Sequence, residues 1–200
     1  MRRLACLLTT ILLSTACGSS STTPTSTPTT LHADVNDSTG DAVVSAGVPT
    51  PPDMVHGTLD VSGGNLTVTV QFAPGTLDPQ TTRLTVQLDT DQNAGTGVPP
   101  GNGLGIDYVL DVWPRTSQTI VQRATPATCV IGAGCYADAG TVGVTVGTNT
   151  MTATVPLSML GSGSGPMNYR IVAYASPQSS VPAVVADQMP DLTLAPAHIP

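Results

Sequence analysis

Apolar and polar residues alternate along much of the chain, and this alternation is the strongest structural signal in the sequence. The stretches "NLTVTVQF" (65–72), "RLTVQL" (83–88) and "IDYVLDVW" (106–113) place apolar side chains at every second position. A period of two predicts strands that are buried on one face. The predicted inward residues are Leu66, Val68, Val70, Phe72, Leu84, Val86, Leu88, Ile106, Tyr108, Leu110 and Val112.

Six further segments have the length and composition of strands, and short Gly, Pro, Asn and Asp-rich turns separate them. They are 54–61, 118–123, 142–146, 151–155, 168–175 and 183–189. The stretch "PLSMLG" has room for a single helical turn. About nine short strands with one apolar face each predict an all-β, two-sheet antiparallel β-sandwich of jelly-roll or immunoglobulin-like type.

The charged residues support this fold class and restrict the partners. All thirteen acidic residues are Asp, Glu and Lys are absent, and the basic residues are six arginines. Glu and Lys favour exposed helix faces, whereas Thr and Val favour strands, so few or no helices are expected. The acidity argues against nucleic acid and anionic lipid as partners and suits divalent cations.

The N-terminus predicts export and a lipid anchor. In "MRRLACLLTTILLSTAC", two arginines precede an apolar run that is too short to cross a bilayer, and small residues precede Cys17. This resembles a bacterial lipobox, in which the cysteine is acylated, although Ser14 stands where Leu is usual. The alternative is an ordinary secretory signal cut near Ala16. With residues 1–16 removed, thirteen aspartates and four arginines leave a net charge of −9.

A Ser/Thr/Pro-rich segment at 18–31 follows and predicts a flexible tether, because it has little apolar surface to bury. Residues 32–200 are then long enough for one domain with its own core. We therefore expect an extracytoplasmic domain held at the cell membrane or outer membrane through lipid on Cys17.

Cys129 and Cys135, in "CVIGAGC", are the pair that remains for the domain. An even pair in an exported chain favours a disulfide. A thiolate metal site is the alternative, but two ligands without a nearby His are too few.

The stretch "DTDQNAGTGVPPGNGLGIDY" is the main candidate for a metal site. Asp89, Asp91 and Asn93 stand at alternate positions, and Asp107 returns to the next strand. Oxygen ligands in such an arrangement suit calcium. The loop is not an EF-hand, because Ala94 and Pro100 occupy the positions of the conserved Gly and Glu. The alternative is an acidic, glycine-rich hairpin loop without metal.

Together with "DVNDSTGD" at 34–41 and "ADQMPD" at 186–191, this loop resembles exported β-sandwich modules grouped with family 9 carbohydrate-binding modules and DOMON-like domains. The resemblance implies structural Ca²⁺ at Asp89, Asp91, Asn93 and Asp107. It also implies a weaker second site at Asp34, Asp37 and Asp41, joined by Asp187 or Asp191 if the chain ends meet. Some members of that group bind sugars or haem.

Residues for ligand binding or catalysis are few. Trp113 is the candidate sugar platform, with structural packing as the alternative. Haem would need an axial ligand from His32, His56, His198, Met54 or Met189. A GxSxG elbow is absent, HExxH is impossible without Glu, and Asp107 and Asp111 would lie about 13 Å apart on one strand. We therefore predict a calcium-stabilised, non-catalytic binding or structural module with glycan as the leading ligand. A haem or redox module and a hydrolase are the alternatives.

Overall fold

A computed structural model describes residues 30–44, 50–98, 103–126, 129, 135–161, 165–175, 184–191 and 195–200. The predicted signal peptide, Cys17 and nearly all of the predicted tether lie outside these residues. Within them the chain forms antiparallel strands and two short 3₁₀ turns, so the predicted all-β class is confirmed. No helical segment in this part of the chain combines the length and the hydropathy that crossing a bilayer requires.

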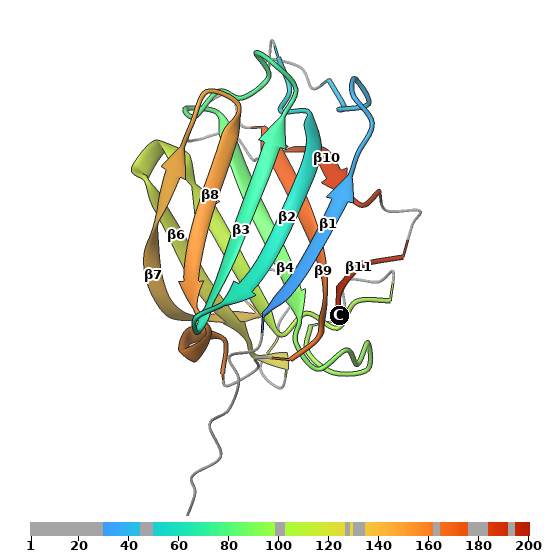
Figure 1. Cartoon of the computed structure of the whole chain (residues 1–200), viewed down its shortest axis with the longest axis vertical. Helices are drawn as coiled ribbons and strands as arrows, with labels where there is room; N and C mark the ends of the chain where they lie inside the picture. The colour runs from blue at the N-terminus through green and yellow to red at the C-terminus, as the bar shows by residue number, and fades with distance from the viewer. Residues whose placement is uncertain are drawn as a thin grey trace, which may run out of the picture.

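The strands follow the chain in the order that Figure 1 labels. They are β1 (Leu31–Asn36), β2 (Met54–Ser62), β3 (Asn65–Phe72), β4 (Thr82–Asp89), β5 (Tyr108–Trp113), β6 (Gln118–Ala124), β7 (Tyr136–Val146), β8 (Thr150–Pro156), β9 (Met167–Ala175), β10 (Val184–Met189) and β11 (Ala197–Ile199). The 3₁₀ turns are η1 (Pro114–Thr116) and η3 (Leu157–Leu160). The second of these is the helical turn predicted for "PLSMLG".

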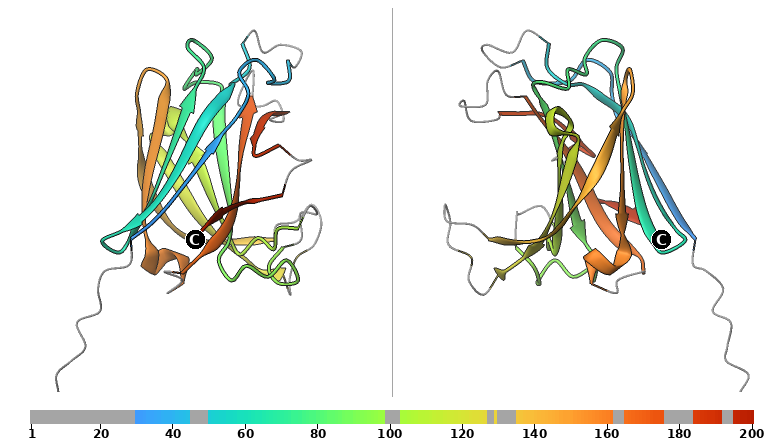
Figure 2. Two further views of the ribbon diagram at one scale, coloured as in Figure 1. Left: turned by 45° about the vertical axis from the view of Figure 1, so that its right-hand side comes forward. Right: turned by 90° about the vertical axis from the view of Figure 1, so that its left-hand side faces the viewer.

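The strands form one continuous hydrogen-bonded path instead of two separate sheets. The order is β1-β2-β3-β8-β7-β6-β5-β4-β9-β10, and β11 pairs with β9 off this path. The long strand β7 makes the link, because its first part pairs with β6 and its last three residues pair with β8. The sheet curls back on itself into two facing layers, which Figure 2 shows from the side.

The two free edges of the curled sheet approach each other. The chain just after β1 meets β10, where the Val43 amide donates a hydrogen bond to the Ala186 carbonyl at 2.7 Å. Gly57 in β2 lies against the side chain of Met189 in β10, since a Cβ on Gly57 would lie 2.6 Å from Cε of Met189. The structure is therefore nearly closed.

The core lies between the two layers and consists of the side chains that the alternation assigned to it. The predicted inward residues of β3, β4 and β5, from Leu66 to Val112, are 7% exposed or less. Tyr169 and Met54 are fully buried among them. The period-two pattern thus predicted the correct face of each of these strands.

The predicted strands differ from the observed ones mainly at their ends. Two strands were missed, β1 and the three-residue β11, and β7 begins six residues before the predicted start at 142. Ile106 lies outside β5, where it forms an isolated bridge with Val98. The predicted disulfide is present between Cys129 and Cys135, whose Cα atoms are 4.2 Å apart.

Candidate functional site

Eight aspartates gather in two clusters at opposite ends of the curled sheet (Figure 1). The loop cluster consists of Asp89, Asp91 and Asp107. The edge cluster consists of Asp37, Asp41, Asp53, Asp187 and Asp191, and it forms two overlapping triads. In every triad, one carboxylate oxygen from each residue lies within 4.8 Å of the others, which is the spacing of ligands around one hard cation.

The loop cluster forms where the chain leaves β4 and returns to β5. Asp89 is the last residue of β4 and is fully buried. The Asp107 amide donates to the Leu88 carbonyl at 2.9 Å, which sets Asp107 beside the end of β4. Three of the four residues predicted for the first metal site therefore lie together.

Protein donors satisfy most of the oxygens in the loop cluster. Asp89 accepts hydrogen bonds from the Asn93 amide at 3.1 Å, the Gly105 amide at 3.5 Å and the Asn168 side chain at 3.3 Å. The Thr96 hydroxyl donates to Asp91 at 2.9 Å, and the Thr90 amide donates to Asp107 at 2.9 Å. These contacts hold the loop without any further group.

Asn93 takes a different position from the one expected of a ligand. Its backbone amide donates to both Asp89 and Asp91, and its side-chain oxygen accepts the Gly95 amide at 3.0 Å. Gly105 is needed for this fold of the loop, because a Cβ there would collide with the Asn93 carbonyl. Asn93 therefore shapes the loop and donates hydrogen bonds toward the aspartates.

The edge cluster forms where the β1–β2 connection meets β10. Asp37 follows β1 and Asp53 immediately precedes β2, whereas Asp187 lies within β10. The Met54 amide donates to Asp187 at 2.6 Å, which ties the start of β2 to β10. Residues distant in the sequence thus meet at the seam between the two free edges of the sheet.

Several oxygens of the edge cluster lack hydrogen-bond donors. Asp53 is 5% exposed, and its Oδ2 accepts the Gly40 amide at 2.8 Å. Its Oδ1 is buried and has no partner among the described residues, and the same holds for Oδ2 of Asp37. Burying a carboxylate oxygen without a donor or cation is costly, so both atoms mark a polar partner that the fold itself does not supply.

The electrostatics of the edge cluster disfavour five negative charges. Burial, followed by repulsion from Asp37 and Asp41, raises the pKa of Asp187 to about 7 against hydrogen bonds from the Met54 and Gln188 amides. Burial, together with repulsion from Asp41, Asp191 and Asp53, raises the pKa of Asp37 to about 6. Within the described residues, no arginine or histidine forms an ion pair with any of the five.

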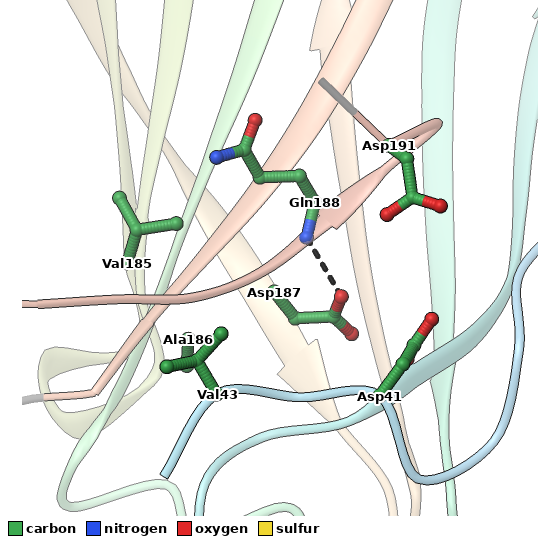
Figure 3. Close-up of a pocket in the computed structure, with 7 residues that line it drawn as sticks. All are labelled: Asp41, Val43, Val185, Ala186, Asp187, Gln188 and Asp191. Carbon is green, nitrogen blue, oxygen red and sulfur yellow. Dashed lines mark hydrogen bonds between the residues drawn. The ribbon is translucent and has the colours of Figure 1, made fainter. Parts of the chain in front are cut away.

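The edge cluster opens onto a hollow of about 370 Å³. Figure 3 shows the carboxylates of Asp41, Asp187 and Asp191 turned toward one another at its wall. Asp34 does not join them. It lies on β1, where its Oδ2 is 3.6 Å from Nε2 of His32. Asp53 was missed in the sequence, where it stands alone between prolines and a strand, without the alternate spacing that singled out the other aspartates.

Trp113 forms part of a small aromatic and charged group on the outer face of the sheet. The Arg83 guanidinium lies 4.5 Å from the centre of the Trp113 ring and 5.6 Å from that of Tyr174. Arg83 also pairs with the buried Asp111 through two hydrogen bonds. The guanidinium of Arg83 thus covers one face of the Trp113 indole. The Asp111 carboxylate holds this guanidinium through their ion pair.

The residues considered as haem ligands lie partly in the core and partly at the surface. Met54 and Met189 are fully buried in the main core. His32 forms a hydrogen bond with Asp60 at 2.6 Å, and this bond is the main reason that the pKa of His32 is raised. The ring of His198 forms a hydrogen bond with the Gln92 side chain at 2.8 Å. His56 pairs with Asn36 across β1 and β2.

The sequence was compared with models of protein families and with curated proteins, and it matches none of them.

Proposed function

We propose that the chain is an exported lipoprotein whose folded domain is a cation-stabilised, non-catalytic binding or structural module of the bacterial envelope. Acylated Cys17 and the 18–31 tether would hold it at the membrane, and the two facing layers would serve as a β-sandwich scaffold like that of family 9 carbohydrate-binding modules and DOMON-like domains. The observation that carries the metal part of this proposal is the convergence of Asp89, Asp91 and Asp107 within 4.8 Å.

A calcium ion in the loop cluster would link the end of β4 to the start of β5 and stabilise the eighteen-residue connection from Thr90 to Asp107. Calcium accepts six to eight oxygen ligands at about 2.3–2.6 Å, and carboxylates, carbonyls and water together supply that number in flexible loops. The ion would thus act as a staple, since its ligands would come from both ends of one long connection.

The test is a thermal melt of the purified full-length protein with calcium and with EDTA. We expect the melting temperature to rise with calcium, and we expect Asp91→Asn to reduce that rise because Asp91 is exposed and contributes to the loop cluster alone. Asp34→Asn is the matched control, since it removes an exposed aspartate outside both clusters. A melting temperature that does not change between calcium and EDTA would refute the proposal.

Glycan is the leading ligand, and Trp113 with Tyr174 and Arg83 is the surface that would contact it. Aromatic rings stack against sugar faces, and the ion pair with Asp111 holds the guanidinium in place beside them. Screening the purified protein on a glycan array, with Trp113→Ala alongside, tests this part. Binding that Trp113→Ala leaves unchanged would exclude this surface.

The anchor is tested separately, by labelling cells with a fatty-acid analogue. We expect label on the wild-type chain and none on Cys17→Ala, which should leave the membrane fraction. Label that persists on Cys17→Ala would contradict the lipoprotein assignment without affecting the metal proposal.

A further inference from the structure

The edge cluster has a composition that a single cation does not explain. Its five carboxylates form two triads, Asp41–Asp53–Asp187 and Asp37–Asp41–Asp191. Within each triad, one carboxylate oxygen of every residue lies within 4.8 Å of the others. Asp41 is the member that they share. An oxygen-ligated calcium has ligands up to about 5 Å apart on its opposite sides, so each triad by itself has the dimensions of one coordination shell.

The inner triad is the buried one. Asp53 and Asp187 are 5% and 7% exposed, and the free Oδ1 of Asp53 lies in the protein interior without a donor among the described residues. A cation in contact with this oxygen would supply the partner that the fold does not. Because Asp53 precedes β2 and Asp187 belongs to β10, the ion would also tie together the two edges of the sheet.

The outer triad is open to solvent. Asp41 and Asp191 are exposed, and both line the hollow that Figure 3 shows. Asp37 contributes a second buried and unpartnered oxygen, Oδ2. A cation bound here would retain water ligands on the side of the hollow and would exchange more easily than the inner one.

Asp41 has the geometry of a bridge between the two sites. It is exposed and is the one residue that belongs to both triads, so each of its two carboxylate oxygens can serve as a ligand. A carboxylate that bridges two divalent ions holds them about 3.5–4 Å apart, as in two-metal centres. Two divalent cations would also offset four of the five negative charges, whereas one would leave three uncompensated.

We infer that the edge cluster is a two-cation site in which Asp41 bridges an inner ion, held by Asp53 and Asp187, and an outer ion, held by Asp37 and Asp191. This goes beyond the proposed function, because it requires neither the loop site nor a glycan ligand. The inner ion closes the seam of the sheet, and the outer ion gives the hollow an open coordination position.

The experiment measures the number of bound calcium ions in the purified full-length protein by equilibrium dialysis and metal analysis. We expect Asp41→Asn to lose two ions, the double variant Asp37→Asn/Asp191→Asn to lose one, and Asp34→Asn to lose none. Asp91→Asn separates the two proposals, because it reports on the loop cluster alone and leaves the count at the edge cluster unchanged. A loss of one ion or none in Asp41→Asn would overturn the two-cation inference.

Manganese provides a readout that does not depend on the folding of Asp41→Asn. Two bridged Mn²⁺ ions give a spin-coupled electron paramagnetic resonance spectrum, which we expect in the wild-type protein. The double variant Asp37→Asn/Asp191→Asn should convert it to the spectrum of isolated ions. A wild-type spectrum of isolated ions alone would overturn the inference.

Discussion

The loop cluster and the edge cluster are built from the same residue type, yet the protein treats their charges in opposite ways. At the loop cluster, amide and hydroxyl donors from Thr90, Asn93 and Thr96 satisfy the carboxylates. At the edge cluster, Asp37 and Asp53 each keep a buried oxygen without a partner among the residues that the structure describes, and the pKa of Asp187 is raised to about 7. We therefore expect a loop held by its own hydrogen bonds to tolerate the loss of an ion better than the seam between the two sheet edges.

The largest expected effect is that of chelation at pH 8. A ligand present at a thousand times its dissociation constant stabilises the folded state by about 4 kcal/mol. In a domain of this size that corresponds to a fall in melting temperature of about 10 °C when EDTA removes the ions. We expect Asp53→Asn to lose most of this difference and Asp91→Asn to lose a smaller part of it. The reverse ranking, read from melts with and without EDTA, would contradict the comparison.

The next effect is the pH dependence of the metal-free protein. The folded-state pKa values of Asp187 and Asp37, about 7 and about 6, lie above the ordinary value of 3.8. The folded state therefore binds more protons than the unfolded state between about pH 4 and pH 7, and the free energy of unfolding falls as the pH rises through that range. We expect the chain in EDTA to be more stable at pH 5 than at pH 8 by about 2–3 kcal/mol.

Chemical denaturation in EDTA at the two pH values measures this difference. Asp187→Asn should reduce the slope, because it removes the group with the largest shift, whereas Asp91→Asn should preserve it. A metal-free protein that becomes more stable from pH 5 to pH 8 would show that the edge carboxylates do not repel one another as the structure indicates.

A smaller effect is expected from Asp89→Asn in the absence of metal. Asp89 is fully buried and accepts hydrogen bonds from Asn93, Gly105 and Asn168, so an amide group would set its own N–H atoms against donors. The expected loss in the free energy of unfolding is about 2 kcal/mol. Urea denaturation in EDTA gives the value, and Asp78→Asn, in an exposed turn, is the control. An unchanged stability would mean that hydrogen bonds do not hold the loop.

The smallest effect is expected from Thr96→Ala. The Thr96 hydroxyl donates to Asp91 at an exposed position, and such a bond contributes about 0.5 kcal/mol. We expect nearly unchanged global unfolding and faster amide exchange around residues 93–97, measured by hydrogen–deuterium exchange. Faster exchange near residues 37–41 as well would indicate that the two clusters are coupled across the molecule.

Local pattern was sufficient for most of the strands and for the three aspartates of the loop cluster. Alternation identified the buried faces of β3, β4 and β5, and the spacing of Asp89 and Asp91 identified a loop that its flanking strands close. Both depend on contacts between neighbours in sequence or across one connection. The strand β1 was missed although Leu31, Ala33 and Val35 alternate with polar residues in "LHADVN", because the predicted tether extended to residue 31. The strand β11 was missed because three residues carry almost no periodicity.

The edge cluster shows the limit of such patterns. The resemblance of "DVNDSTGD" pointed to Asp34, Asp37 and Asp41, yet Asp34 faces His32 and Asp53 takes a place in the cluster. Asp34 lies within β1, whereas Asp37 and Asp41 lie in the connection that follows this strand. Side chains three positions apart on an extended strand point to opposite faces, so Asp34 points away from the direction of Asp37.

The sequence by itself determined the all-β class, the core faces of its strands, the disulfide and the acidic loop, because each is decided by composition or by contacts local in the chain. The tertiary structure alone decided that the strands form one curled sheet with its two edges nearly joined. It thereby also decided that Asp53 and Asp187, 134 positions apart, share a site. Sheet curvature arises from the summed twist and packing of all the strands, and no segment of the sequence encodes it alone.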